Sequence, residues 1–328
     1  MKKAMISKIK NFLARPNNQK PHILLTRPRR ILKRLLELAL YPLVKFLLQT
    51  RIGRDCLYSA LPKNELVIVK TNEELYYVVN TSDNDIGRSI FRDRQSFDSQ
   101  HLISALNLIG KDKSIIIDVG ANVGTIGILG VSQGYFKKCI AFEPEPNNFK
   151  LLQTNVNING LSEKFELRNE ALSNKTGGVL NFELSETNFG DHRVQIQKTS
   201  GLNNEKIRKV ISANVNTLDC VLENYDLSKC FLFMDTQGYE GCILSGALRL
   251  IDASVPIVTE FWPYGLKRSN GLDMFYTVLS GSKYTAMWDL RYPNKKLKFS
   301  VDEIKGIALD LGENGAFTDL VFSNELVV

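Results

Sequence analysis

The chain has 328 residues, of which 44% are hydrophobic and 23% charged, values typical of a globular protein. The net charge of +7 is uneven, because residues 1–50 hold twelve Lys or Arg and one acid, Glu37, which leaves −4 for the rest of the chain. A protein that binds nucleic acid usually carries its basic charge on the folded domain, so we expect no nucleic-acid partner.

The cysteines and histidines indicate neither a disulfide framework nor a zinc centre. The five cysteines form no CxxC pair and are odd in number, which favours reduced thiols in a cytoplasmic protein. The three histidines, His22, His101 and His192, lie far apart in the sequence, so we expect no zinc site.

Residues 1–54 are expected to be a basic leader with an amphipathic helix. Within 28–50, charged and polar side chains recur every three or four residues and leucines fill much of the rest. The longest uncharged run, 38–44, has seven residues, whereas a membrane-spanning helix needs about 20. We expect this helix either to lie on the inner surface of an anionic membrane or to pack on the catalytic body or a partner. Pro42 should break or kink it, or start a second helix.

Residues 55–110 are expected to form a smaller N-terminal cap. The stretch 66–80 is typical of a hairpin, because two alternating runs flank Asn72. Residues 99–110 have helical spacing and lead into the first strand of the main sheet.

Residues 111–328 alternate between strand-like and helix-like segments, which predicts a parallel sheet with helices on both faces. Apolar runs predict strands at 114–118, 139–143, 164–172, 229–235 and 255–261, and helices at 123–135, 146–160 and 240–251. Two later runs, 284–290 and 318–324, are predicted as an antiparallel edge pair. The polar stretch 185–215 is interpreted as an insertion that carries substrate loops. The fold class is therefore α/β, a Rossmann-like, doubly wound, mostly parallel sheet of seven strands.

The stretch IIIDVGANVGTIGI, residues 115–128, ends a strand at Asp118 and continues as a glycine-rich turn. Ligands of doubly wound sheets bind at the carboxyl ends of the strands, where glycines allow close backbone approach. A dinucleotide fold requires G-x-G-x-x-G, but the second glycine is replaced here by Asn122. A carboxylate at Asp118 repels a pyrophosphate and suits an ammonium or sulfonium group, both of which S-adenosylmethionine carries.

Acidic residues also end the next two strands. Glu143 is placed to accept both ribose hydroxyls, and Glu170 or Asn169 to bind an adenine amino group. The residues that we expect to bind S-adenosylmethionine are Asp118, Gly120, Ala121, Asn122, Gly124, Glu143, Pro144, Glu170 and Ala171.

Seven blocks between residues 83 and 265 resemble the FkbM-type methyltransferase family. Besides 115–128 they are AFEPEPNNFKLLQTNVNING (141–160), NEALSNKTG (169–177), ETNFGDHRV (186–194), VNTLDCVL (215–222), LFMDTQGYEGCILSGA (232–247) and VTEFWP (258–263). The resemblance implies a class I methyltransferase fold and methyl transfer from S-adenosylmethionine to a hydroxyl of a sugar, a glycan or a related metabolite. Many members have Val-Glu-Gly where this chain has Thr236-Gln237-Gly238, a departure that concerns the acceptor.

Methyl transfer to a hydroxyl needs alignment and a nearby base. The candidate catalytic residues are Asp235, which ends the fourth strand, His192, whose ordinary pKa suits a base, and Glu240. The candidate acceptor-binding residues are Asn188, Arg193, Gln237 and Glu260. We expect no metal; a site made by Asp235, Glu260 and a neighbouring Asn is the weaker alternative.

Two other functions remain open from the sequence. One is a nicotinamide-dependent dehydrogenase on the same sheet, against which the misplaced glycines argue. The other is a non-catalytic, membrane-associated protein that keeps the fold, against which the intact Asp118, Glu143 and Asp235 argue.

Overall fold

The computed structural model describes residues 40–110, 112–196 and 208–324. They fall into two compact units, one ending at Gly53 and the other beginning at Arg54. Helix α3 (Arg51–Ala60) contains this boundary. Our own division of the chain at residues 54 and 110 stays a prediction.

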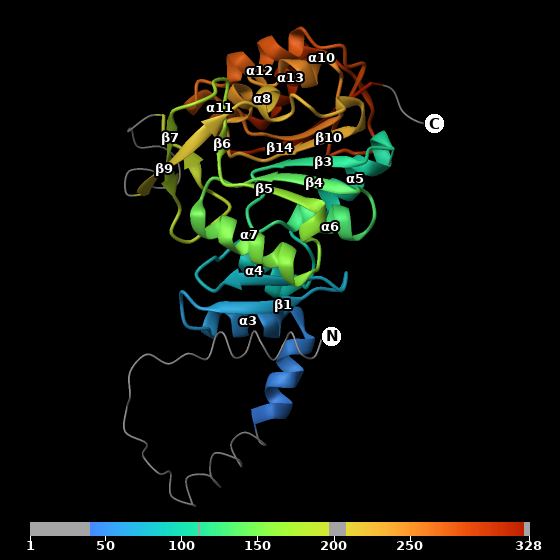
Figure 1. Cartoon of the computed structure of the whole chain (residues 1–328). Coiled ribbons are helices and arrows are strands. Elements are labelled where there is room, and N and C mark those ends of the chain that lie inside the picture. Colours follow the sequence, from blue (N-terminus) through green and yellow to red (C-terminus); the bar gives the residue numbers. More distant parts are fainter. Residues whose placement is uncertain (1–39, 111, 197–207, 325–328) are drawn as a thin grey trace, which may run out of the picture. The chain divides into compact units, whose positions relative to one another are not determined.

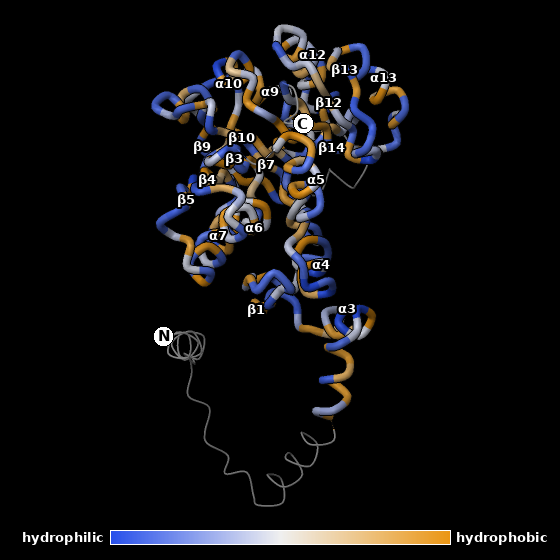
Figure 2. The backbone as a smooth tube through the Cα atoms, turned by 90° about the vertical axis from the view of Figure 1, so that its right-hand side faces the viewer, coloured by the Kyte–Doolittle hydropathy of each residue, from blue (hydrophilic) through white to orange (hydrophobic). Residues whose placement is uncertain are grey.

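In the first unit, residues 40–49 are helical and Pro42 lies within the helix. Much of this helix is hydrophobic (Figure 2), and Leu40, Leu43 and Phe46 expose more than half of their side chains. The rest of the predicted leader, 1–39, lies outside the described residues. None of the helices in the described ranges has the length and apolar character needed to cross a membrane.

The second unit begins with a hairpin and two helices, as predicted. Strand β1 (Leu66–Lys70) pairs antiparallel with β2 (Tyr76–Asn80), and Ile68 lies opposite Val78. Helices α4 (Ile86–Asp93) and α5 (Ser99–Ile109) follow. The Asn155 side chain binds the N–H and the C=O of Val78, so it provides an edge of β2 with the partner that a further strand would supply.

The central sheet is the predicted mostly parallel sheet (Figure 1). Its parallel strands are β3 (Ile115–Val119), β4 (Lys138–Phe142), β5 (Phe165–Arg168), β10 (Cys230–Met234) and β11 (Ile257–Phe261). The order in the sheet is β13-β12-β14-β11-β10-β3-β4-β5, so the chain order reverses between β3 and β10. This reversal is the point at which such sheets bind ligands.

The late strands form the predicted antiparallel pair, but the pair does not form the edge of the sheet as predicted. Strand β14 (Thr318–Ser323) lies antiparallel between β11 and β12 (Ala286–Asp289), so it is internal. A two-residue strand, β13 (Leu297–Lys298), forms the edge and brings the sheet to eight strands rather than seven.

Helices cover both faces of this sheet, so its central strands are buried on both sides. One face packs against α5, α6 (Thr125–Ser132) and α7 (Pro146–Ile158), and the other against α9 (Glu240–Leu244), α10 (Leu248–Asp252), α12 (Leu272–Ser280) and α13 (Val301–Leu311). Shorter helices are α8 (Leu218–Val221) and α11 (Pro263–Arg268). The predicted helix 240–251 is two helices, because the chain turns at Gly246, where a Cβ would lie 2.1 Å from the Ser173 carbonyl oxygen.

A second, smaller sheet corrects two predictions. It consists of β6 (Ala171–Leu172), β7 (Val179–Leu184), β8 (Arg193–Val194) and β9 (Lys209–Asn216), in the order β6-β9-β7-β8. The predicted strand 164–172 therefore divides: β5 belongs to the central sheet, and the chain leaves it after Arg168 to pair Ala171 with Val215. The predicted polar insertion contributes β8 and most of β9, so its described part holds strands as well as loop.

Candidate active site

Two backbone turns meet where the chain order of the sheet reverses. The turn after β3 and the turn after β10 are joined by a hydrogen bond from the Asp235 N–H to the Val119 carbonyl, 3.0 Å long. Gly120 has a φ of +84°, and a Cβ there would lie 1.8 Å from the Asp235 carbonyl oxygen. Only glycine fits this position, which explains the first glycine of the motif.

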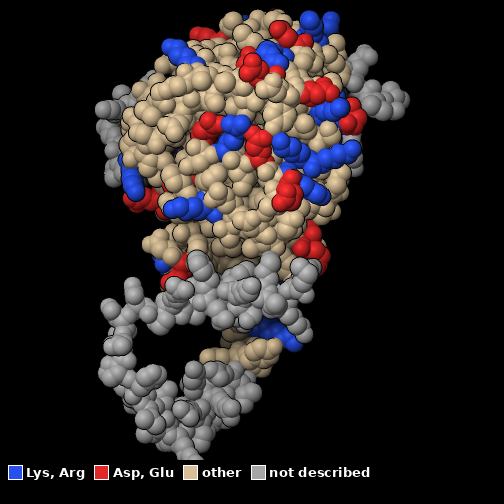
Figure 3. Space-filling view, viewed as in Figure 1, with Lys and Arg blue, Asp and Glu red and all other residues tan. Residues whose placement is uncertain are grey.

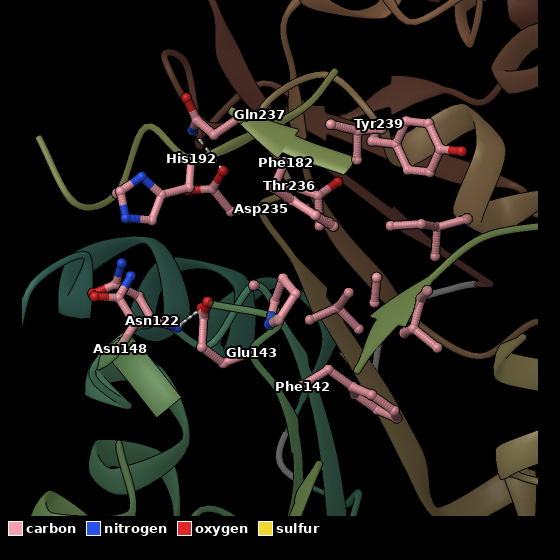
Figure 4. A pocket seen from close by; sticks show the side chains of 18 of the residues that line it. Asn122, Phe142, Glu143, Asn148, Phe182, His192, Asp235, Thr236, Gln237 and Tyr239 are labelled. Atoms are coloured by element: carbon pink, nitrogen blue, oxygen red, sulfur yellow. Dashed lines mark hydrogen bonds between the residues drawn. The ribbon is translucent and has the colours of Figure 1, made fainter. Parts of the chain in front are cut away.

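A cavity of about 680 Å³, open to solvent, lies at this junction, and we call it the switch-point cavity. Figure 4 shows Asn122 and Glu143 on one side of it and Asp235, Gln237 and His192 on the other. Six of the nine residues predicted to bind the cofactor line it: Gly120, Asn122, Glu143, Pro144, Glu170 and Ala171. Most of the residues that we predicted from their positions at strand ends and in the glycine turn therefore lie together at one cavity.

Glu143 is held as an acceptor at this cavity. Its Oε2 accepts the Asn122 N–H at 2.9 Å and its Oε1 accepts the Glu145 N–H at 2.8 Å. Burial raises the pKa of Glu143 to about 8, although both hydrogen bonds act to lower it. The carboxyl is thus fixed in position, and each oxygen keeps a lone pair for a further donor.

Phe189 and Gly190 line the switch-point cavity, and sequence reasoning missed Asn148, one of the two side chains that hold Phe189. The amide groups of Asn122 and Asn148 both donate to the Phe189 carbonyl, at 2.8 and 3.0 Å. Asn148 lies in the first turn of α7, in a Pro-Asn-Asn sequence whose position at a helix start was the available signal.

A second cavity adjoins the first and is larger, about 1270 Å³ with open solvent included. We call it the acidic cavity, because six carboxyl groups line it: those of Asp85, Asp98, Asp191, Asp235, Glu260 and Asp319. The two cavities share Ile86, Gly190, Asp235 and Gln237, so Asp235 and Gln237 stand at their border.

Gln237 ties the acids at this border together. Its backbone has a φ of +56°, and its Nε2 donates to Asp235 Oδ1 at 2.8 Å and to Glu260 Oε1 at 3.2 Å. Burial raises the pKa of Asp235 to about 6, and repulsion from Asp319 adds to this shift. Burial also moves the pKa of Glu260 well above its usual range, with repulsion from Asp235 adding to the effect.

Residues 118–279, about half of the chain, match the family described as the methyltransferase FkbM domain. The chain carries an FkbM methyltransferase domain. The protein is therefore an S-adenosylmethionine-dependent methyltransferase with a class I Rossmann-like fold, as the resemblance implied. The match favours neither the dehydrogenase nor the non-catalytic alternative.

Solved structures similar to this methyltransferase share few identical residues with it. TYW2 of P. horikoshii, in complex with MeSAdo, has 14% identity and a TM-score of 0.40 over 81% of this chain and 74% of that one. The tRNA m1G37 methyltransferase of M. jannaschii has 11% identity and a TM-score of 0.39, over 81% of this chain and 59% of that one. The precorrin-6y C5,15-methyltransferase of Geobacter metallireducens has 10% identity and a TM-score of 0.35, over 69% of this chain and 87% of that one. No match was found in a search of curated protein sequences. Likenesses at this level carry no argument about the acceptor.

Asp118 does not face the switch-point cavity, contrary to our prediction. Its carboxylate lies under the turn, where Oδ2 accepts the Gly127 N–H at 3.0 Å at the start of α6, and burial raises its pKa to about 7. Ala121 and Gly124 are likewise not among the residues that line the cavity. Gly124 begins α6 with a φ of +90°, and a Cβ there would lie 2.6 Å from Leu152 Cδ1. In this structure these three residues form or support the turn and do not line the cavity.

Glu240 is not placed to act as a base. Its side chain is completely buried beneath the turn after β10, and it lines neither cavity. Its Oε1 accepts the N–H and the hydroxyl of Thr236, at 2.9 and 2.8 Å, and the N–H of Gly238. The carboxylate therefore holds the loop that presents Asp235.

His192 lines the switch-point cavity, but its tautomer does not suit a base. Its Nδ1 accepts the Ser185 N–H at 3.1 Å, so the ring proton of the neutral imidazole is on Nε2. Burial lowers the pKa of His192 to about 4, which corrects our expectation of an ordinary value. At neutral pH this side chain offers the cavity a donor.

His101, which sequence reasoning passed over, is better placed. It lines the acidic cavity, and its Nδ1 lies 3.2 Å from Asp319 Oδ2 and 3.7 Å from Asp98 Oδ1. These carboxylates favour a proton on Nδ1, which leaves Nε2 as an acceptor; within the described ranges Nε2 has no hydrogen-bond partner. Strand pairing sets Asp319 opposite Glu260, a long-range relation that no local pattern encodes.

The predicted acceptor-binding residues Asn188 and Arg193 line the acidic cavity, and their side chains already bind other residues of the chain. Asn188 donates to Asp85 Oδ2 at 2.8 Å and accepts the Gly190 N–H. Arg193 is buried, pairs with Asp191 and lies 4.5 Å from the ring centroid of Trp262. Both therefore form the cavity wall.

Gly120→Ala should lower the free energy of unfolding by clearly more than Gly134→Ala. Both glycines have positive φ, but a Cβ at 134 meets nothing within 4 Å, so that change costs only the conformational term of about 1–2 kcal/mol. At 120 the clash with a backbone carbonyl adds to it, for a total of about 3 kcal/mol or more. Urea unfolding of both variants measures the difference, and equal midpoints would contradict the close contact of the two turns.

Proposed function

We propose that this methyltransferase transfers the methyl group of S-adenosylmethionine to a hydroxyl of a sugar, a glycan or a related metabolite. The observation that carries the proposal is the junction of two cavities at Asp235 and Gln237, one with the predicted cofactor side chains and one acidic. A donor and an acceptor bound in adjoining cavities can be brought into line, and alignment supplies much of the rate of such a displacement.

The residues of the switch-point cavity fit the cofactor. Glu143 keeps lone pairs for the two ribose hydroxyls, and Pro144, Glu170 and Ala171 line the side on which we place the adenine. When bound, the cofactor supplies a methyl group on a positively charged sulfur, so that a C–O bond can form while the C–S electrons return to sulfur. Asp235 is half-buried and lines both cavities, and its carboxyl group suits that positive charge.

The lining of the acidic cavity supports an uncharged acceptor rather than a nucleic acid. Its two guanidinium groups, of Arg193 and Arg208, are both bound to Asp191, so both are already engaged by a carboxylate. Acidic and basic side chains are interspersed on the face in Figure 3. Binding of a phosphate backbone depends on cationic side chains that can pair with phosphates, whereas carboxyl groups form hydrogen bonds with sugar hydroxyls.

We assign the role of general base to His101 in place of His192 and Glu240. The hydroxyl proton would move to His101 Nε2, while Asp319 holds the ring through Nδ1 and stabilises the imidazolium that forms. His101 is 40% exposed at the side chain, so the proton can pass on to solvent.

Calorimetric titration of the full chain should show saturable binding of S-adenosylmethionine and none of NAD. Glu143→Gln keeps the shape of the side chain but replaces one acceptor oxygen by an NH2 group, so we expect binding to weaken about 10- to 100-fold. Glu163→Gln, on an exposed turn, is the matched control. Binding of NAD alone by the folded protein, or an unchanged affinity in Glu143→Gln, would overturn the assignment.

Transfer of labelled methyl groups should reach methyl glycosides or purified glycans and not tRNA. With an acceptor in hand, His101→Ala should lower kcat about 100-fold or more without changing the affinity for the cofactor, and added imidazole should restore part of the rate. Labelling of tRNA would refute the acceptor class. An unchanged kcat in His101→Ala would refute only the role of His101.

We also propose that the protein is cytoplasmic and contacts the inner membrane surface through residues 28–50. All five cysteines are free, which is usual in a reducing compartment. Apolar side chains are exposed along residues 40–49, and residues 1–50 carry a net charge of +11, which together suit an anionic surface. An acceptor attached to a lipid would be met at that surface.

The full chain should co-sediment with vesicles that contain phosphatidylglycerol and much less with pure phosphatidylcholine. Replacing Leu43 and Phe46 by Glu should reduce this binding, since it removes exposed apolar area and adds negative charge. Leu309→Glu, at a leucine that is 84% exposed on α13, is the control. Equal loss in the control, or no binding by the unaltered chain, would contradict a membrane role for this helix.

A further inference from the structure

Three carboxyl groups converge at the border of the two cavities. Asp235 follows β10, Glu240 begins α9 and Glu260 lies in β11, and one oxygen from each lies within 4.8 Å of the others. Glu240 and Glu260 are at least 95% buried, whereas Asp235 is partly open to solvent.

Two oxygens of this group are buried and unpaired. Glu240 Oε2 and Glu260 Oε2 have no hydrogen-bond partner among the described residues, although the other oxygen of each is bound. A buried carboxylate oxygen without a partner is costly, because it has lost its water and gained nothing in return. The pair of orphaned atoms therefore points to a group that this chain does not itself supply.

The side chains around the three acids do not supply enough positive charge to balance them. The Gln237 amide contributes two neutral hydrogen bonds, to Asp235 and Glu260. The Arg193 guanidinium acts on Glu260 from a distance but pairs with Asp191 and lies on the Trp262 ring. Three carboxylates this close repel one another in a medium of low dielectric, and a bound cation relieves that repulsion.

We propose that Asp235, Glu240 and Glu260 bind one divalent cation that prefers oxygen ligands, Mg²⁺ or Mn²⁺. Three carboxylate oxygens suit such ions, which commonly keep several waters in their remaining positions. Asp235 and Glu260 line the acidic cavity, so the ion has a path of entry and an open side toward an acceptor. This departs from our expectation of no metal, since Glu240 was not recognisable in the sequence as the third ligand.

The inference deepens the proposed function. A cation at this border would lie beside the place where we put the acceptor hydroxyl, and two neighbouring hydroxyls of a sugar could replace two of its waters. Binding of the ion, however, depends only on the three carboxylates and can be measured without an acceptor.

The test is Mn²⁺ binding to the full chain after treatment with EDTA, measured as the loss of the six-line spin-resonance signal of the free ion. We expect one Mn²⁺ per chain, displaced by Mg²⁺, and an affinity at least tenfold weaker in Glu260→Gln. Glu143→Gln, which alters a buried carboxyl of the switch-point cavity, should bind Mn²⁺ as the unaltered chain does.

The same two variants separate this inference from the proposed function. Glu260→Gln should keep the affinity for S-adenosylmethionine, which also shows that it is folded, whereas Glu143→Gln should lose it. Absence of bound Mn²⁺, or equal Mn²⁺ affinity in Glu260→Gln, would overturn the cation site and leave cofactor binding intact. Loss of cofactor binding with normal Mn²⁺ binding would instead contradict the cofactor assignment alone.

Discussion

The close contact between two backbone turns is the constraint on which the rest of the site depends. Gly120 follows β3 and Asp235 follows β10, the strands that flank the reversal of chain order in the sheet. With any side chain at position 120 the two turns would separate. Because they touch, Asp235 stands at the border of both cavities, where a donor and an acceptor can meet.

Buried acids hold the backbone around these turns, and this structural role is one reason why carboxyl groups cluster at the site. Asp118, Glu143 and Glu240 each accept backbone N–H groups of a turn, and such bonds are strong where water is excluded. Burial raises the pKa of Asp118 to about 7 and of Glu143 to about 8. A carboxyl whose pKa is raised on folding supports the fold most at low pH. That support declines as the pH rises from the unfolded value of about 4 to the folded one.

Local sequence patterns predicted the strands, the glycine turn and Glu143, because each depends on residues that are neighbours in the chain. The side-chain directions of Asp118 and Glu240 were not predictable, since a strand-end acid can serve a ligand or the next helix equally well. The lowered pKa and the tautomer of His192 were not predictable either, because they depend on burial and on the hydrogen bond from the Ser185 N–H. The role that we assign to His101 depends on its contact with Asp319, which lies more than two hundred positions away in the sequence.

The acidic cavity draws part of its lining from outside the FkbM match, and this bears on how the acceptor is chosen. The FkbM match, 118–279, contains every side chain that we assign to the cofactor. His101 on α5 and Asp319 on β14 lie outside it, on either side, and meet because β14 pairs with β11. The carboxyl groups of Asp85 and Asp98 in the acidic cavity also precede the match. The segments that flank the domain can therefore change the acceptor wall while the turns at Gly120 and Asp235 stay fixed, which separates acceptor choice from cofactor binding.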